Sequence, residues 1–244
     1  MSSIAYTLIK FAYKQIKKAY KNIFIGDRQR MNNQKGFTLA EVLITLGIIG
    51  VVAALTLPAL IQNHKKSETT ARLKKFYSIM AQAVLMSEND NGPVEDWEKD
   101  KETTKDEETG LYPDSDYESS QKYFNKYIKN YLKYLKTEKD EKTNLFKVLL
   151  TDGSSVKLRN GSCMDLIFDI NGDKNPNEEG RDQYRFLICK KSDSNTNRSF
   201  SAYVRADAKS RKERLNYCKS TPAYCSGLLE YDNWEIRKDY PHRL

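Results

Sequence analysis

The sequence predicts an α+β protein in which a long N-terminal helix packs on a small antiparallel β-sheet. Three observations predict this class. Residues 37–61 form an apolar run, residues 59–90 continue with apolar side chains at helical spacing, and from residue 145 the pattern changes toward strands. Of the 244 residues 39% are hydrophobic, with 16 Tyr, 9 Phe and 2 Trp. This composition excludes a disordered chain and a multi-span membrane protein, and it allows one ordinary core.

The net charge of +8 would suit a nucleic-acid-binding protein, but the excess sits at one end of the chain. Residues 1–36 hold eight basic side chains and one acidic side chain, so residues 37–244 are close to neutral, with 33 basic and 32 acidic. Lysines and tyrosines do alternate in residues 121–136, yet the acidic stretch before them would neutralise the patch. We therefore do not expect nucleic acid among the partners.

Residues 37–61 predict a retained transmembrane helix. At about 1.5 Å per residue the run spans about 37 Å, more than a hydrocarbon core of about 30 Å requires. It is longer than the apolar run of a signal peptide, and no small-residue cleavage site follows it. The basic flank predicts that residues 1–36 stay in the cytoplasm and that the rest of the chain is exported.

Two residues inside this run are unusual. Glu41 is its only ionisable side chain, and a lone acid in a bilayer costs about 2.5–3.5 kcal/mol. Either the carboxylate reaches the membrane surface, or it meets a positive partner inside an assembly. Pro58 removes one helical hydrogen bond and predicts a kink or a loosened turn.

Residues 35–42, which read KGFTLAEV and precede the apolar helix, resemble the class III signal of type IV pilins and type II secretion pseudopilins. The resemblance covers about 30 residues. It implies cleavage between Gly36 and Phe37 by a prepilin peptidase, methylation of the Phe37 amine, and pairing of Glu41 with the terminal amine of an adjacent subunit. It also implies an inner-membrane precursor, assembly platform proteins, and a filament of pilin or pseudopilin subunits. The 36-residue leader is long for the family, so Met31 is an alternative start.

The exported part should begin with the soluble half of the long helix, residues 62–90, and this helix should end at Asn91-Gly92-Pro93. We expect residues 91–120 to form a solvated, mobile acidic loop and residues 121–136 to form an amphipathic helix. The helical stripe expected to pack on the domain consists of Leu73, Phe76, Tyr77, Met80, Ala83 and Val84.

Residues 121–244 should form the domain itself. A hairpin is expected from residues 145–150 and 155–158, and two further strands from residues 164–170 and 184–190. Trp234, near the C-terminus, is expected in the core.

The loop at residues 169–182 reads DINGDKNPNEEGRD and is rich in oxygen ligands. Ca²⁺ prefers about six to eight oxygens, which alternating Asx side chains and turn carbonyls can supply. Its spacing excludes an EF-hand, and a plain Asx/Gly/Pro turn without an ion is equally compatible with these residues. The loop also resembles one found in many pilin-like proteins, and some major pseudopilins bind calcium in a comparable place. This resemblance implies a structural Ca²⁺, with Asp173 and Asn175 as weaker candidates beside the main ligands Asp169, Asn171, Asn177 and Asp182.

All cysteines lie in the exported part, which is typical of an oxidising compartment. Four cysteines allow three pairings, and we favour Cys163–Cys189 across the two strands that flank the Asx loop, with Cys218–Cys225 closing a short turn. A zinc site is disfavoured because no C-x₂-C spacing occurs and both histidines, His64 and His242, are distant in sequence.

The sequence shows no catalytic constellation, neither a P-loop nor a G-x-S-x-G turn, so we expect a peptidase substrate and not an enzyme. The leading hypothesis is a pilin-like filament subunit. The alternative is a membrane-tethered binding module, an adhesin or a sensor, that never assembles.

Overall fold

The computed structural model describes Lys14 and residues 39–244, apart from the side chains of Ala40 and Glu41. The chain divides into two compact units, residues 1–64 and residues 65–244. The predicted leader, Lys14 excepted, and the predicted cleavage site at Gly36 and Phe37 lie outside the described residues.

Helix α2 (Leu39–Asn91) has 53 residues and continues through Pro58. Within it a stretch long and apolar enough to cross a membrane has a mean hydropathy of 2.4. The helix ends where the sequence predicts, because Gly92 takes a φ of 80° and Pro93 follows.

Six antiparallel strands form one sheet in which each strand pairs with the next along the chain. Four of them match the predicted strands closely. The first strand and the last were not predicted. The strands are β1 (Tyr134–Lys139), β2 (Phe146–Leu150), β3 (Ser155–Asn160), β4 (Met164–Asp169), β5 (Gln183–Ile188) and β6 (Phe200–Ala202).

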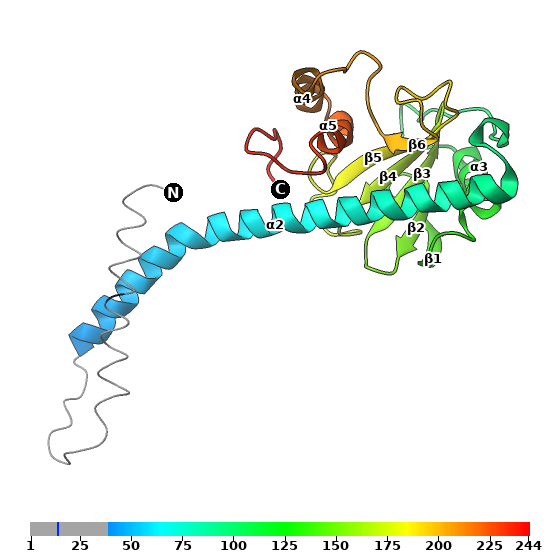
Figure 1. Ribbon diagram of the computed structural model, residues 1–244. Helices are drawn as coiled ribbons and strands as arrows, with labels where there is room; N and C mark the ends of the chain where they lie inside the picture. The colour runs from blue at the N-terminus through cyan, green and yellow to red at the C-terminus, as the bar shows by residue number, and fades with distance from the viewer. Residues whose placement is uncertain (1–13, 15–38) are drawn as a thin grey trace. The chain divides into compact units, whose positions relative to one another are not determined.

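The second half of α2 lies across one face of this sheet (Figure 1). Strand alternation places apolar side chains on that face, so that Val156 pairs with Phe168 in the register of β3 and β4. The ring of Phe168 stacks on Phe76 of α2 with centroids 3.9 Å apart. The predicted stripe is therefore confirmed: Tyr77 is half-buried and the other members, Leu73, Phe76, Met80, Ala83 and Val84, are buried.

The acidic segment is only partly the solvated loop predicted over residues 91–120, because residues 104–110 are exposed and irregular whereas both ends of the segment contact the domain. It contains a short 3₁₀ turn, η1 (Val94–Asp96), and its next residues bind the sheet: Thr103 N donates to Asn160 O (2.9 Å), and Lys99 Nζ donates to Gly161 O (2.7 Å). Asp116 is fully buried, and both its carboxylate oxygens accept from the backbone N–H of Asn160. The hydroxyls of Thr103 and Ser120 also donate to this carboxylate, so donors from three parts of the domain surround it.

The helix predicted at residues 121–136 also begins and ends earlier. Helix α3 (Asp114–Tyr123) starts inside the acidic segment, since acids favour the first turn of a helix, and a π turn, η2 (Phe124–Ile128), follows it. The last residues of the predicted helix belong to β1, where pairing with β2 overrides the helical pattern.

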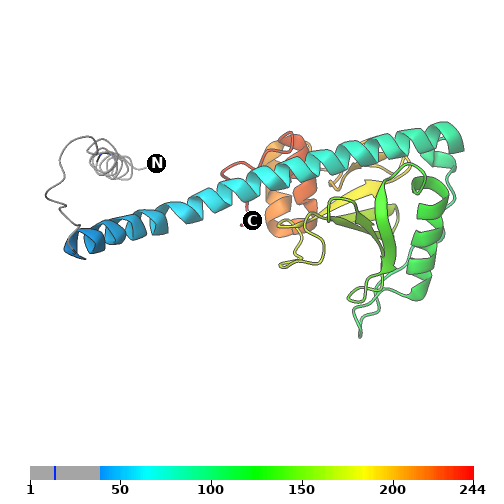
Figure 2. The same cartoon turned by 90° about the horizontal axis from the view of Figure 1, so that it is seen from below.

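Three short helical elements, absent from the prediction, follow the sheet: α4 (Arg211–Ser220), η3 (Pro222–Tyr224) and α5 (Cys225–Tyr231). Helix α5 packs against β5 and β6 (Figure 2). Trp234, just after α5, is buried with its ring 5.8 Å from that of Phe186, as the sequence predicts.

The contact between Phe76 and Phe168 should carry a large share of the domain's stability. We expect Phe168→Ala to lower the free energy of unfolding by about 3–5 kcal/mol, because it leaves a cavity under α2. Urea unfolding of the full-length protein in detergent, followed by the fluorescence of the buried Trp97 and Trp234, measures this change.

Leu135→Ala is the matched control. Leu135 also lies in the sheet, but its side chain is 65% exposed, so its loss should change the free energy by less than about 0.5 kcal/mol. Equal effects of the two substitutions would contradict the assignment of the core.

Candidate functional site

The predicted assembly residues lie at the start of α2. Glu41 is in its first turn and Pro58 is inside it. Most large apolar side chains of α2 between Val42 and Ile61 are exposed, with Leu43 60% and Ile44 63% exposed. An exposed apolar surface of this extent indicates a region that is covered by lipid or by other helices.

The Asx-rich loop, residues 169–182, connects β4 to β5, and backbone hydrogen bonds and α2 hold the residues where it begins and ends. Ile170 N donates to Asp182 O (3.0 Å), which extends the ladder beyond the pair Asp169 and Gln183. Arg72 of α2 donates to Ile170 O (3.0 Å), so the long helix also holds the first residue of the loop.

A close approach fixes the next turn of the loop. Gly172 has a φ of 70°, and a Cβ there would lie 2.8 Å from the carbonyl oxygen of Gly153 in the β2–β3 turn. Only glycine therefore fits at this position.

Asp182 organises the second half of the loop. Its buried carboxylate accepts from Asn177 N (2.8 Å), Glu178 N (2.7 Å) and Asn171 Nδ2 (3.3 Å). These bonds draw Asn171 and Asn177 toward the end of β4, where Asp169 stands. The structure thus brings together all four residues that the sequence singles out as ligands.

Three oxygens lie close together in the loop, those of Asp169 Oδ2, Gly172 O and the Asn177 side chain, and of these Asp169 Oδ2 also accepts from Gln183 Nε2 (2.9 Å). The side-chain oxygen of Asn177 faces two other acceptors, Asp169 Oδ2 and Gly172 O. If the amide were rotated by 180°, its nitrogen would donate to these two oxygens over 3.0 and 3.2 Å. The buried Asn171 Oδ1 has no hydrogen-bond partner among the described residues. Oxygens about 3 Å apart with no hydrogen between them suit a bound cation, since Ca²⁺ ligands sit at about 2.3–2.6 Å. A turned Asn177 amide would satisfy Asp169 and Gly172 without an ion.

The pKa values of two acids in the loop shift in opposite directions. Burial raises the pKa of Asp169 to about 6, and the neighbouring charge of Asp182 adds to this. Asp173, a weaker candidate, is engaged elsewhere: its carboxylate pairs with Lys147 Nζ at 2.5 Å, and this hydrogen bond lowers its pKa. Asn175, the other weaker candidate, accepts from Asn177 Nδ2 (3.4 Å).

Two further groups at this site were not predicted. Gly172 contributes a backbone carbonyl, and Gln183 Nε2 donates to Asp169 Oδ2 (2.9 Å). A carbonyl ligand leaves no side-chain signal in a sequence, whereas Gln183 could have been found as the residue opposite Asp169 in the hairpin.

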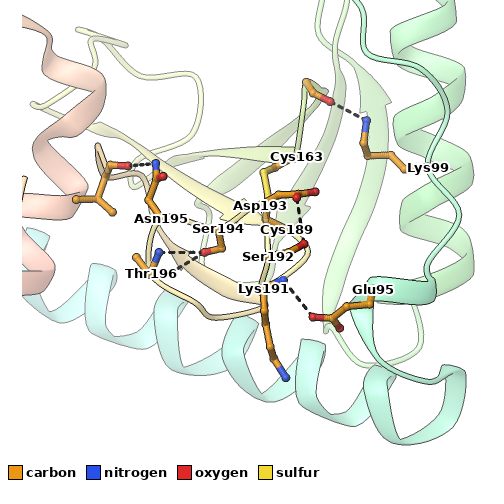
Figure 3. The surroundings of a disulfide bond; sticks show 12 residues. Glu95, Lys99, Cys163, Cys189, Lys191, Ser192, Asp193, Ser194, Asn195 and Thr196 are labelled. Atoms are coloured by element: carbon orange, nitrogen blue, oxygen red, sulfur yellow. Dashed lines mark hydrogen bonds between the residues drawn. A yellow bond between two sulfur atoms is a disulfide. The ribbon is translucent and has the colours of Figure 1, made fainter. Parts of the chain in front are cut away.

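The structure contains both disulfides that the sequence favours, Cys163–Cys189 and Cys218–Cys225. The first lies beyond the pair Met164 and Ile188, at the end of the β4–β5 hairpin remote from the Asx loop. Figure 3 shows the chain that follows it, where Lys191 N donates to Glu95 Oε1 (3.1 Å). The hairpin is thereby closed covalently at one end and by the Asx loop at the other.

The second disulfide joins the end of α4 to the start of α5. His242, which is distant in sequence, lies beside it in space, with Nε2 3.0 Å from Cys218 O. The sequence argument that separated the cysteines from both histidines is therefore wrong for His242, because the C-terminal segment returns to α4.

Comparison with known proteins finds matches to the N-terminal part of the chain. The model of the prokaryotic N-terminal methylation motif matches residues 31–57. Fimbrial protein Q and the type IV major alpha-pilin, both of Moraxella bovis, are each 55% identical to the chain over 40 residues. These residues make up 16% of the chain, 26% of fimbrial protein Q and 25% of the alpha-pilin. The match thus spans about a quarter of each relative. No solved structure matches the chain.

The methylation motif, the long apolar helix and the antiparallel sheet define a type IV pilin-like protein. The chain belongs to a family of unknown function (DUF6613), whose model matches residues 59–244.

The buried Asp169 should give the protein an unusual pH dependence when no divalent cation is present. Its pKa of about 6 in the folded protein exceeds its ordinary value of 3.8, so the folded state holds this proton more tightly than the unfolded state does. Its contribution to stability is complete below about pH 4 and should be lost as the pH rises to about 6.

Urea unfolding of the full chain in chelator, repeated across this range, measures the effect. Asp169→Asn should remove this component, whereas Asp193→Asn should retain it, because Asp193 is exposed and its carboxylate accepts from the neighbouring Ser192 hydroxyl. Identical pH profiles for the native protein and Asp169→Asn would contradict the assignment.

Proposed function

We propose that the chain is the precursor of a filament subunit of the type IV pilus or type II secretion pseudopilus kind. The observation that carries the proposal is the methylation motif at residues 31–57, which continues into the exposed apolar half of α2. In this proposal residues 1–36 are a cytoplasmic leader, residues 37–61 anchor the chain in the inner membrane, and residues 62–244 are periplasmic.

Processing and assembly follow from the N-terminal segment. A prepilin peptidase cuts between Gly36 and Phe37, and the new Phe37 amine is methylated. Assembly platform proteins then move the subunit from the membrane into the filament, where its helix exchanges lipid for the helices of other pilin subunits. Small residues allow the helices to approach closely, and Ala40, Gly47, Gly50, Ala53 and Ala54 supply them.

Glu41 gives this assembly its register. A carboxylate among apolar helices is costly unless a cation compensates it, and the terminal amine of a neighbouring subunit supplies that charge. Pro58 leaves one carbonyl of α2 without its donor, which eases bending of the helix as subunits pack.

Pilin homology favours a structural role over a catalytic one. The alternative is a membrane-tethered binding module, an adhesin or a sensor that does not assemble. The two functions differ in what happens to the leader, because only the filament subunit must lose it.

We expect Glu41→Ala to abolish incorporation into filaments while leaving membrane insertion intact. Insertion into a bilayer does not require the carboxylate, whereas the alignment of neighbouring subunits in the proposed filament does. Immunoblots of sheared filaments and of inner membranes measure the two outcomes. Thr45→Ala is the matched control on the same helix, because the Thr45 hydroxyl bonds only its own helix at Val42 O.

Intact-mass measurement of the native chain decides between the two functions. A mature chain beginning at methylated Phe37 supports the subunit, and a retained leader supports the tethered module. Normal incorporation of Glu41→Ala into filaments would falsify the register argument alone.

We also propose that the Asx-rich loop holds a structural Ca²⁺. The proposal is supported by the nearness of the Asn177 side-chain oxygen to Asp169 Oδ2 and Gly172 O, in the orientation that places this oxygen toward them, and by Asn171 Oδ1, which is buried with no partner among the described residues. Asp182 acts mainly through hydrogen bonds that shape the loop. The ion would neutralise the buried Asp169 and fasten the loop between β4 and β5.

Calcium should therefore raise the thermal stability of the full-length protein in detergent. At about 100 times the dissociation constant, binding adds about 2.7 kcal/mol to the free energy of unfolding. Asp169→Ala should lose the shift, and Asp193→Ala should keep it. The shift should weaken as the pH falls below about 6, where protons compete for Asp169. No shift at millimolar Ca²⁺ would leave the loop as a plain turn with the Asn177 amide turned.

A further inference from the structure

Cys218, Cys225 and His242 form a cluster of possible metal ligands. Their ligand atoms, the two sulfurs and one imidazole nitrogen, all lie within 4.8 Å of one another. They come from three separate places, the end of α4, the start of α5 and the C-terminal tail. In the oxidised protein the sulfurs are joined, so neither is a thiolate that could bind an ion.

His242 is held beside the cysteines by contacts on both sides of it in the chain. Tyr240 OH donates to Gly180 O (2.6 Å), and Arg243 O accepts from Arg181 Nε (2.8 Å). Earlier in the tail, Arg211 of α4 forms an ion pair with Asp239 (2.7 Å). These bonds hold the tail beside α4 through groups other than the imidazole, and His242 Nε2 adds a contact with Cys218 O (3.0 Å).

The backbone of the Asx loop makes room for the imidazole. A Cβ at Gly180 would lie 2.9 Å from the His242 ring and 3.2 Å from the Cys225 sulfur. The absence of a side chain at Gly180 therefore lets the imidazole and the sulfur approach each other.

The surroundings suit a thiophilic ion. Cys218 and Cys225 are fully buried and pack with Leu228, while Leu215 and Tyr240 cover them from outside. A site of two thiolates and one imidazole selects soft or borderline ions such as Zn²⁺ over Ca²⁺ or Mg²⁺. Among the described residues the other cysteine pair, Cys163–Cys189, belongs to no such group of three ligands, although Asp193 lies near it (Figure 3).

We propose that Cys218, Cys225 and His242 bind Zn²⁺ when the disulfide is reduced, with water as the fourth ligand. A dithiol reductant supplies two electrons and two protons, which convert the disulfide to two thiols while the dithiol becomes a disulfide. Zn²⁺ then displaces the two thiol protons and binds two thiolates and the neutral imidazole. The ion and the disulfide are alternative cross-links between α4 and α5, and the ion adds the tail to the link.

The test uses the full-length protein in detergent, carrying Cys163→Ser and Cys189→Ser so that one cysteine pair remains. It is reduced with a phosphine, freed of reductant without air, and titrated with Co²⁺, whose thiolate charge-transfer absorption reports bound sulfur. We expect this absorption in the reduced chain, its loss on adding Zn²⁺, and no absorption in the oxidised chain.

His242→Gln is the informative variant, because it keeps a polar side chain in the tail and removes the imidazole. Its affinity for Co²⁺ should fall by at least about 10- to 100-fold, the loss seen when groups that only orient a ligand are removed. His64→Gln, the matched control at the other histidine, should bind as before.

Three results would overturn the proposal. The first is a reduced chain that shows no charge-transfer absorption, and the second is an unchanged affinity for Co²⁺ in His242→Gln. The third is a reduced chain that unfolds and is not refolded by Zn²⁺, as measured by the circular dichroism of its aromatic side chains. Restoration of that signal by Zn²⁺ would support the site. None of these outcomes depends on filament assembly, so the proposed function is tested separately.

Discussion

The packing of α2 on the apolar face of the sheet is the contact on which the rest of the domain depends. A six-stranded sheet with one apolar face needs a partner to cover it, and α2 provides the central part through Phe76 and Met80. Arg72 on the same helix holds the start of the Asx loop. The geometry of the candidate cation site thus follows from the placement of this helix, since the loop begins where the helix fixes it.

The elements predicted correctly are those whose side chains repeat with a clear period or form a short apolar run. The stripe on α2 repeats at helical spacing, β3 alternates apolar and polar residues, and β2, β4 and β5 contain short apolar runs that are buried. Strand β1 reads YLKTEK and lies at the sheet edge with most of its side chains exposed, so it carries no such signature. Helix α4 was missed although Ser210 and Glu213 form a capping box, which is a local signal that a close reading of the sequence can detect.

The candidate site also has some parts that the sequence predicts and others that only the folded structure reveals. The Asx side chains are visible in the sequence, and the loop does gather Asp169, Asn171, Asn177 and Asp182. The Gly172 carbonyl and the return of His242 to the cysteines depend on the folded path of the backbone, which no local spacing encodes. The burial of Asp116 could not be predicted from the sequence either. An acid within an acidic stretch is expected to be exposed, and its donor on β3 is known only from the folded structure.

The order of the strands has a consequence for biogenesis. Each strand pairs with the one before it, and in the proposed topology the exported part leaves the membrane in sequence order behind its anchoring helix. The sheet can therefore form strand by strand as the chain emerges. Helix α2 comes first, so the template for the apolar face is present before any strand arrives. Each disulfide also joins cysteines that are consecutive in the sequence, so oxidation during the proposed export would favour the native pairing over the two alternative ones.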